Sequence, residues 1–201
     1  MRTVAIVLSL MVLPTGAAAH GSAATMQGFY SGLVHPLVEA EQALSLVALA
    51  LLGAQLPKTA HQRSFITLVG GLIAGLIIGL IAGGAEGSEG LRFIVLTVGV
   101  LAGGATAAAL GSRFDALWVL GLPAGLGLGL LTAPEAGTAL ALAITIGGSL
   151  LGLGLVWVYA SAVGAWAWHH ASLKALPIAV RVVASWIAAI CLLMLALAFA
   201  P

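Results

Sequence analysis

The feature that most constrains this chain is a succession of long apolar segments. Six of them follow one another, at residues 33–56, 64–83, 92–111, 116–132, 138–160 and 179–200. A transmembrane helix needs about 20 mainly apolar residues, and each segment comes close to that length. The segments are continuously apolar and lack the two-residue alternation of barrel strands. We therefore predict an all-α fold, a polytopic membrane bundle of about six transmembrane helices.

The composition leaves no room for a soluble domain. Hydrophobic residues make up 62% of the chain and charged residues 6%, with a net charge of +1. Soluble domains carry about a quarter charged residues. The near-zero net charge argues against nucleic acid as a partner and makes the lipid bilayer the main one. The single cysteine, Cys191, excludes an internal disulfide and a cysteine-rich metal site.

The first 19 residues have the pattern of a cleavable signal peptide. Arg2 gives the positive start, VAIVLSLMVL the apolar core, and Ala17 to Ala19 the small-residue cleavage site. The core is too short to span a bilayer, although an uncleaved first anchor is the alternative. Cleavage after Ala19 would give His20 a free α-amine beside its imidazole, and both groups bind metals. Residues 20–201 are then expected to form a single six-helix transmembrane domain.

Lysine and arginine positions predict the orientation. With the mature N-terminus outside, five of these residues fall in inside loops: Lys58, Arg63, Arg113, Lys174 and Arg181. The outside loops contain only Arg92, so the positive-inside rule and the signal peptide agree. This predicts a multi-pass protein of the bacterial inner membrane with its mature N-terminus in the periplasm. Glu86, Glu89 and Glu135 then lie on the outer side, where acids either attract cations or are simply tolerated.

Small residues recur every four positions along three of the spans. The sets are Gly71, Gly75, Gly79 and Gly83; Gly99, Gly103, Ala107 and Gly111; and Gly121, Gly125 and Gly129. This spacing lets helix backbones approach closely where lipid supplies no hydrophobic drive. It indicates tight bundling, and such stripes could also bind a membrane-complex partner or a second copy. Trp157, Tyr159, Trp166 and Trp168 are typical of an aromatic belt, and His61, His169 and His170 of loop polarity.

The most polar stretch is HPLVEAEQ, from His35 to Gln42, at the outer end of the first span. Polar groups are expensive in a membrane and usually have a function or a partner. Pro36 suits the first turn of a helix, which would put His35 at its start. In a regular helix Glu39 and Gln42 then share a face with His35, whereas Glu41 points elsewhere.

These side chains form a set of metal ligands of intermediate (borderline) hardness. An imidazole with carboxylate and amide oxygens suits nickel, cobalt, copper or zinc better than magnesium or calcium. We predict a metal site of His20, His35, Glu39, Glu41 and Gln42. The alternative is that both glutamates merely favour the positive end of the helix dipole and His35 forms interfacial hydrogen bonds.

Several stretches resemble the HupE/UreJ family of small membrane proteins linked to hydrogenase and urease maturation. They are the signal peptide ending in Ala-His, the GF followed by HPL, and the tail RVVASWIAAICLL. The family motif reads approximately HPLxGxDH. His35, Pro36 and Leu37 match it, Glu41 replaces its aspartate, and Gln42 and Glu39 replace its second histidine and its glycine. The resemblance implies a nickel or cobalt permease.

The sequence departs from the family pattern in the later spans. Members tend to carry a histidine-rich HGxAHG stretch there, whereas this chain has PAGLGLGL at 123–130, and its fifth span has no histidine before His169. The chain thus keeps the outer half of the pattern without the intramembrane imidazoles.

Two functions follow from these observations. The first is a secondary permease for a divalent transition metal, nickel or cobalt or else copper, bound as cargo with no tightly held cofactor. The second is a non-transporting accessory subunit of a larger membrane complex, favoured by the expected lack of polar residues in the middle of the later spans. No nucleophile–base pair or cofactor motif indicates an enzyme, so no catalytic residue is predicted.

Overall fold

The computed structural model describes residues 23–82, 89–134, 138–170 and 175–198. The predicted signal peptide at 1–19 and His20 lie outside these residues. All the described elements are helical: α2 (Ala23–Val38), α3 (Ala40–Gln55), α4 (Lys58–Ala82), α5 (Glu89–Ala107), the 3₁₀ helices η1 (Leu110–Ser112) and η2 (Asp115–Leu120), α6 (Gly121–Thr132), α7 (Ala139–His169) and α8 (Ala175–Ala198).

The predicted class, a bundle of membrane-spanning helices, is confirmed. Five helical stretches are long and apolar enough to cross a membrane, namely α4, α5, η2 with α6, α7 and α8. The bent pair formed by α2 and α3 raises the number to six if it crosses once. The spans correspond to those expected from the apolar segments, although α7 has 31 residues and extends well beyond 138–160.

The first span differs from the prediction of one helix over 33–56. Helices α2 and α3 meet at Glu39 and bend by 70°. Pro36 therefore lies in the last turn of α2, inside a helix, and not in the first turn of a span. The apolar pattern did not reveal α2 because its polar and small residues resemble a loop. The face expected to carry His35, Glu39 and Gln42 does not exist, because the bend separates them.

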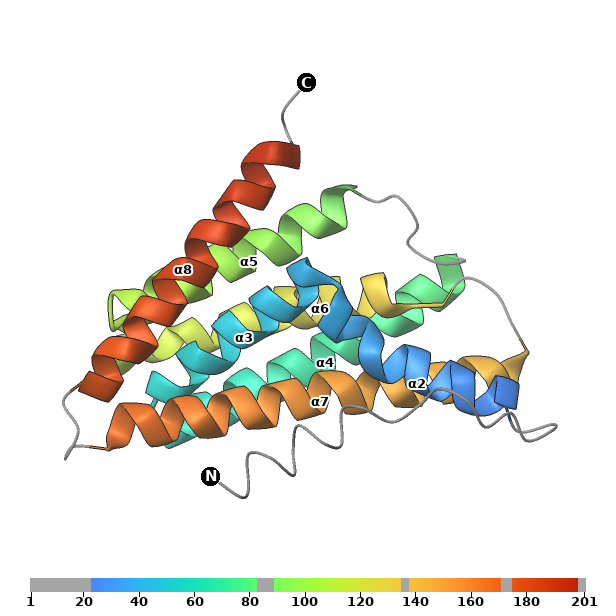
Figure 1. Cartoon of the computed structure of the whole chain (residues 1–201), viewed down its shortest axis with the longest axis horizontal. Coiled ribbons are helices and arrows are strands. Elements are labelled where there is room, and N and C mark those ends of the chain that lie inside the picture. The colour runs from blue at the N-terminus through green and yellow to red at the C-terminus, as the bar shows by residue number, and fades with distance from the viewer. Residues whose placement is uncertain (1–22, 83–88, 135–137, 171–174, 199–201) are drawn as a thin grey trace, which may run out of the picture.

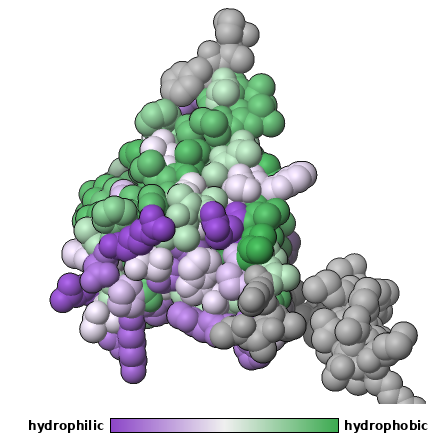
Figure 2. Space-filling model, turned by 90° about the vertical axis from the view of Figure 1, so that its left-hand side faces the viewer, coloured by the Kyte–Doolittle hydropathy of each residue, from purple (hydrophilic) through white to green (hydrophobic). Residues whose placement is uncertain are grey.

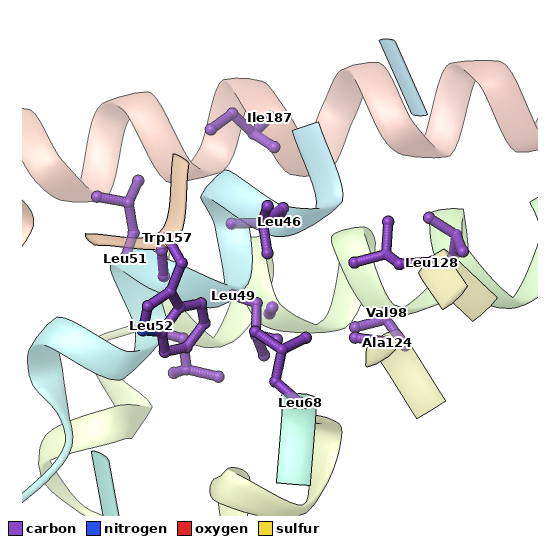
Figure 3. Packing of buried hydrophobic residues seen from close by; sticks show 14 of the residues in the cluster. Leu46, Leu49, Leu51, Leu52, Leu68, Val98, Ala124, Leu128, Trp157 and Ile187 are labelled. Carbon is purple, nitrogen blue, oxygen red and sulfur yellow. The ribbon is translucent and has the colours of Figure 1, made fainter. Parts of the chain in front are cut away.

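Helix α3 forms the centre of the bundle (Figure 1). Twelve of its sixteen residues are buried. Figure 3 shows Leu46, Leu49 and Leu52 of this helix among buried side chains of the surrounding helices: Leu68, Val98, Ala124, Leu128, Trp157 and Ile187. A helix that is apolar on all sides is stable only when other helices enclose it or lipid surrounds it. Here the other helices enclose it.

The predicted glycine stripes pack helix against helix within the chain. Gly71 and Gly75 of α4 lie against the backbone of α6 at Leu122 and Leu126. Reciprocally, Gly125 and Gly129 of α6 lie against the backbone of α4 at Leu68 and Leu72. The two parallel helices thus interlock through alternating glycines. Close packing of this kind maximises van der Waals contact, which is the main attraction between helices in lipid.

One end of the bundle collects most of the basic residues that the structure describes, and we call it the basic end. It contains the ends of α3, α5 and α7 and the starts of α4 and α8, with Lys58, Arg113 and Arg181 (Figure 1). Figure 2 views this end and shows hydrophilic surface gathered on part of it. Two side chains tie its helices together: Gln55 Nε2 donates to the carbonyl of Thr106 at 2.9 Å, and Arg181 Nε to that of Ala107 at 2.7 Å. These bonds satisfy carbonyls at the end of α5.

We expect Gly125→Ala to destabilise the protein by about 1–3 kcal/mol, because the added methyl group would strike the backbone of α4 at Leu68 and Leu72. Gly70→Ala is the matched control, since a Cβ there meets no atom within 4 Å. Alanine also favours a helix by up to about 1 kcal/mol, so the control should be neutral or stabilising. Thermal unfolding of the purified protein in detergent measures both. Equal melting temperatures for the two variants would contradict the interlocked packing.

Candidate metal-binding site

The break between α2 and α3 follows from local sequence. Pro36 has no N–H and cannot donate to the carbonyl of Gly32, its usual α-helical partner. Three residues later Glu39 takes an extended conformation, with φ −81° and ψ 99°. Its N–H donates to the His35 carbonyl at 3.2 Å, and its own carbonyl accepts from Gln42 and Ala43, both at 3.0 Å. The backbone thus stays bonded through a sharp turn between the predicted ligands.

His35 lines a polar pocket of about 480 Å³ at the end of the molecule opposite the basic end. Three helices build this pocket. Ser31, Gly32 and His35 come from α2, Leu131 to Pro134 from the end of α6 and the two residues after it, and Thr145 and Ser149 from α7. The half-buried imidazole therefore faces a cavity whose walls carry several hydroxyl groups.

Close approach of α2 and α7 brings the hydroxyl groups to His35. A Cβ on Gly32 would strike the Thr145 carbonyl and come within 3.0 Å of Ser149 Oγ. In return, Gly148 and Gly152 of α7 lie against the backbone of α2 at Phe29 and Leu33. Only glycine permits this approach, so these glycines position the pocket wall.

Two of the lining hydroxyl groups donate their protons within their own helices. Ser149 Oγ donates to the Thr145 carbonyl at 3.1 Å, and Thr132 Oγ1 to the Leu128 carbonyl at 2.6 Å. Both protons are committed to the preceding helical turn, and the lone pairs remain as acceptors. The expectation that the later spans lack polar residues in their middle is wrong for the fifth span, because the buried Ser149 lies near the middle of the predicted segment 138–160. Thr132 is also buried, but it ends α6. The presence of Ser149 in the sequence was the signal that could have found it.

Glu41 is engaged by a cation. Its Oε1 lies 3.2 Å from Nε of Arg92, in the first turn of α5. The Glu41 side chain is 11% exposed and that of Arg92 57%. Because α3 and α5 run in the same direction, the pair joins their starts, and Ser45 Oγ donates to the Val95 carbonyl at 2.8 Å one turn further on. Arg92 would therefore compete with a metal for the Glu41 carboxylate.

Gln42 has an unmet hydrogen-bonding capacity. The residue is 2% exposed, and its Oε1 has no hydrogen-bond partner among the described residues. An amide oxygen buried without a partner costs about 1–3 kcal/mol. It is the kind of group that a cation, a water molecule or a protonated ligand would satisfy.

The structure brings the predicted ligands into one region without assembling them. Within the described ranges, no group of three His, Cys, Asp or Glu side chains could hold a metal ion. His35 faces the hydroxyl-lined pocket, Glu39 forms the bend, Glu41 pairs with Arg92, and Gln42 is buried in the first turn of α3. His20 lies outside the described residues, so the full five-ligand site stays a prediction.

The Glu41–Arg92 pair gives a stability test. We expect Arg92→Gln to lower stability by about 1 kcal/mol, because it leaves a mostly buried carboxylate without its cation. In a Glu41→Gln background the same substitution should cost much less, since no charge remains to be compensated. A double-mutant cycle by thermal unfolding measures this coupling. Purely additive effects would show that the pair contributes nothing.

Comparison with known proteins matches one part of the chain. The family model described as HupE / UreJ protein matches residues 8–88. No curated protein and no solved structure matches the chain. The family is associated with nickel or cobalt uptake or with accessory roles. The match therefore supports a metal-related function in a membrane. Over the segment that holds the bend and all five predicted ligands, this membrane protein matches the HupE/UreJ family.

Proposed function

We propose that this chain is a secondary permease for a divalent transition metal, nickel or cobalt or else copper. One observation carries the proposal: His35, within the family-matched segment, lines a pocket together with four hydroxyl-bearing residues, Ser31, Thr132, Thr145 and Ser149. Imidazole combined with oxygen donors suits these borderline metals better than magnesium or calcium. The metal is the cargo, and no resident cofactor is required.

The broken first span supports a binding role for this region. Transporters commonly bind ions where a membrane helix is interrupted, because the interruption exposes backbone carbonyls that coordinate cations. Here Pro36 deprives the Gly32 carbonyl of its usual donor, and Gly32 and His35 line the same pocket. The buried Gln42 oxygen adds an acceptor one turn beyond the bend. His20, Glu39 and Glu41 complete the proposed ligand set.

The proposed location is the bacterial inner membrane, with the pocket and the mature N-terminus on the periplasmic side. The basic end would then face the cytoplasm, as the positive-inside rule requires. Its Lys58, Arg113 and Arg181 lie at the end of the bundle opposite the pocket.

A second candidate is an accessory subunit that does not transport. One observation favours it: in the described parts of α4 to α8, the buried polar side chains are hydroxyl groups only. The histidines of these helices, His61 and His169, lie at the basic end, far from His35. The glycine faces of α4 and α6 are already occupied within the chain. A partner or a second copy would therefore bind another surface.

Metal uptake by cells expressing the protein tests the permease proposal. Nickel, cobalt and copper are supplied separately to cells with matched membrane expression of wild type and variants. We expect His35→Ala to reduce uptake of the transported metal at least about tenfold, because its imidazole ligand is lost. His170→Ala is the matched control, since this exposed histidine contacts Trp166 at the other end of the bundle. No uptake of any metal by wild type would exclude the permease and favour the accessory role.

The hydroxyl wall makes a separate prediction. Thr145→Val and Ser149→Ala keep the approximate shape of the pocket and remove two oxygen acceptors. We expect the double variant to raise the metal concentration needed for half-maximal uptake, with melting temperature nearly unchanged. Ser161→Ala, a buried serine of the same helix near the basic end, is the control. Unchanged concentration dependence in the double variant would show that the wall does not contact the metal.

A further inference from the structure

We propose that an anionic phospholipid binds in a groove between α4 and α7 at the basic end. This groove has a volume of about 890 Å³ and lies far along the bundle from the His35 pocket. The proposal is independent of metal transport, because none of the groove residues belongs to the proposed metal site.

The groove has a rigid aromatic floor. Trp157 of α7 is buried, with its ring centroid 6.0 Å from those of His61 and Phe65 of α4. His61 Nδ1 lies 2.9 Å from the Gly53 carbonyl, and since a carbonyl only accepts, this nitrogen carries the proton. The predictions of an aromatic belt for Trp157 and loop polarity for His61 are therefore wrong. Both residues join α3, α4 and α7.

The walls of the groove are apolar and face outward. They include Phe65 and Ile66 of α4 and Val158 and Ala162 of α7, all of which are exposed. In a membrane these side chains meet lipid, and water at this depth would find few hydrogen-bonding partners. An acyl chain is the molecule that fills such a groove, because it is flexible, apolar and present at high concentration.

The mouth of the groove is polar and positively charged. Lys58 and Gln62 from the first turns of α4, and His169 from the last turn of α7, line it together. No aspartate or glutamate is among the described lining residues. A basic pocket between membrane helices, next to an apolar channel, complements the phosphate and the chain of one anionic lipid. A metal fits less well, since the lining offers only two imidazoles and no carboxylate.

Native mass spectrometry of the purified full-length protein in mild detergent tests the proposal. The probes are phosphatidylglycerol and phosphatidylcholine with identical acyl chains, so that only the headgroup charge differs. We expect one phosphatidylglycerol to bind preferentially to wild type. Lys58→Gln combined with His169→Gln should weaken its binding about fivefold or more, the effect of removing one lysine charge near a membrane surface.

Two further variants separate the groove from general surface charge. Arg113→Gln removes an exposed positive charge at the same end but outside the groove and should leave binding unchanged. Ala162→Phe should fill the channel and reduce binding of both lipids. Equal binding of the two lipids to wild type would overturn the proposal. So would equal loss in Arg113→Gln and the groove variant, or full binding by a folded Ala162→Phe protein.

Discussion

Direct contact between helix backbones is the constraint on which the rest of this structure depends. Lipid is as apolar as leucine, so helices in a bilayer gain little from burying apolar side chains and much from close packing. The chain achieves this contact twice with parallel helices, between α4 and α6 and between α2 and α7. Helix α5 meets α8 in the same manner but antiparallel, where Gly103 faces Ala184 and Ala188. These three pairs surround α3.

The candidate site depends on the same packing. The hydroxyl groups of Thr145 and Ser149 reach the neighbourhood of His35 because Gly32 has no side chain to hold α7 away. At the bend at Glu39 the chain leaves α2, which packs against α7, and continues as α3 in the centre of the bundle. Loss of either feature would leave the sequence motif intact and separate its histidine from the oxygen donors.

The sequence allowed the fold class to be predicted because spans of lipid-facing helices need long apolar stretches, whatever their packing partners. The four-residue glycine spacing likewise predicted tight packing, since spacing alone decides which residues share a helix face. The spacing did not reveal which glycine-lined helix packs against which neighbour. The ion pair between Glu41 and Arg92 and the wall contributed by α7 join residues distant in the chain, and no local pattern reports them. The bend was missed because proline occurs both in the first turn of a helix and next to a helix break, so Pro36 alone did not distinguish the two.

The length of α7 has a consequence for how the bundle fits a bilayer. Its 31 residues extend over about 46 Å, which exceeds the roughly 30 Å of the hydrocarbon layer. A helix of this length crosses the layer at a tilt or projects beyond it by several turns. Because α2 packs along α7 through Gly148 and Gly152, α2 follows the same inclination up to its bend with α3.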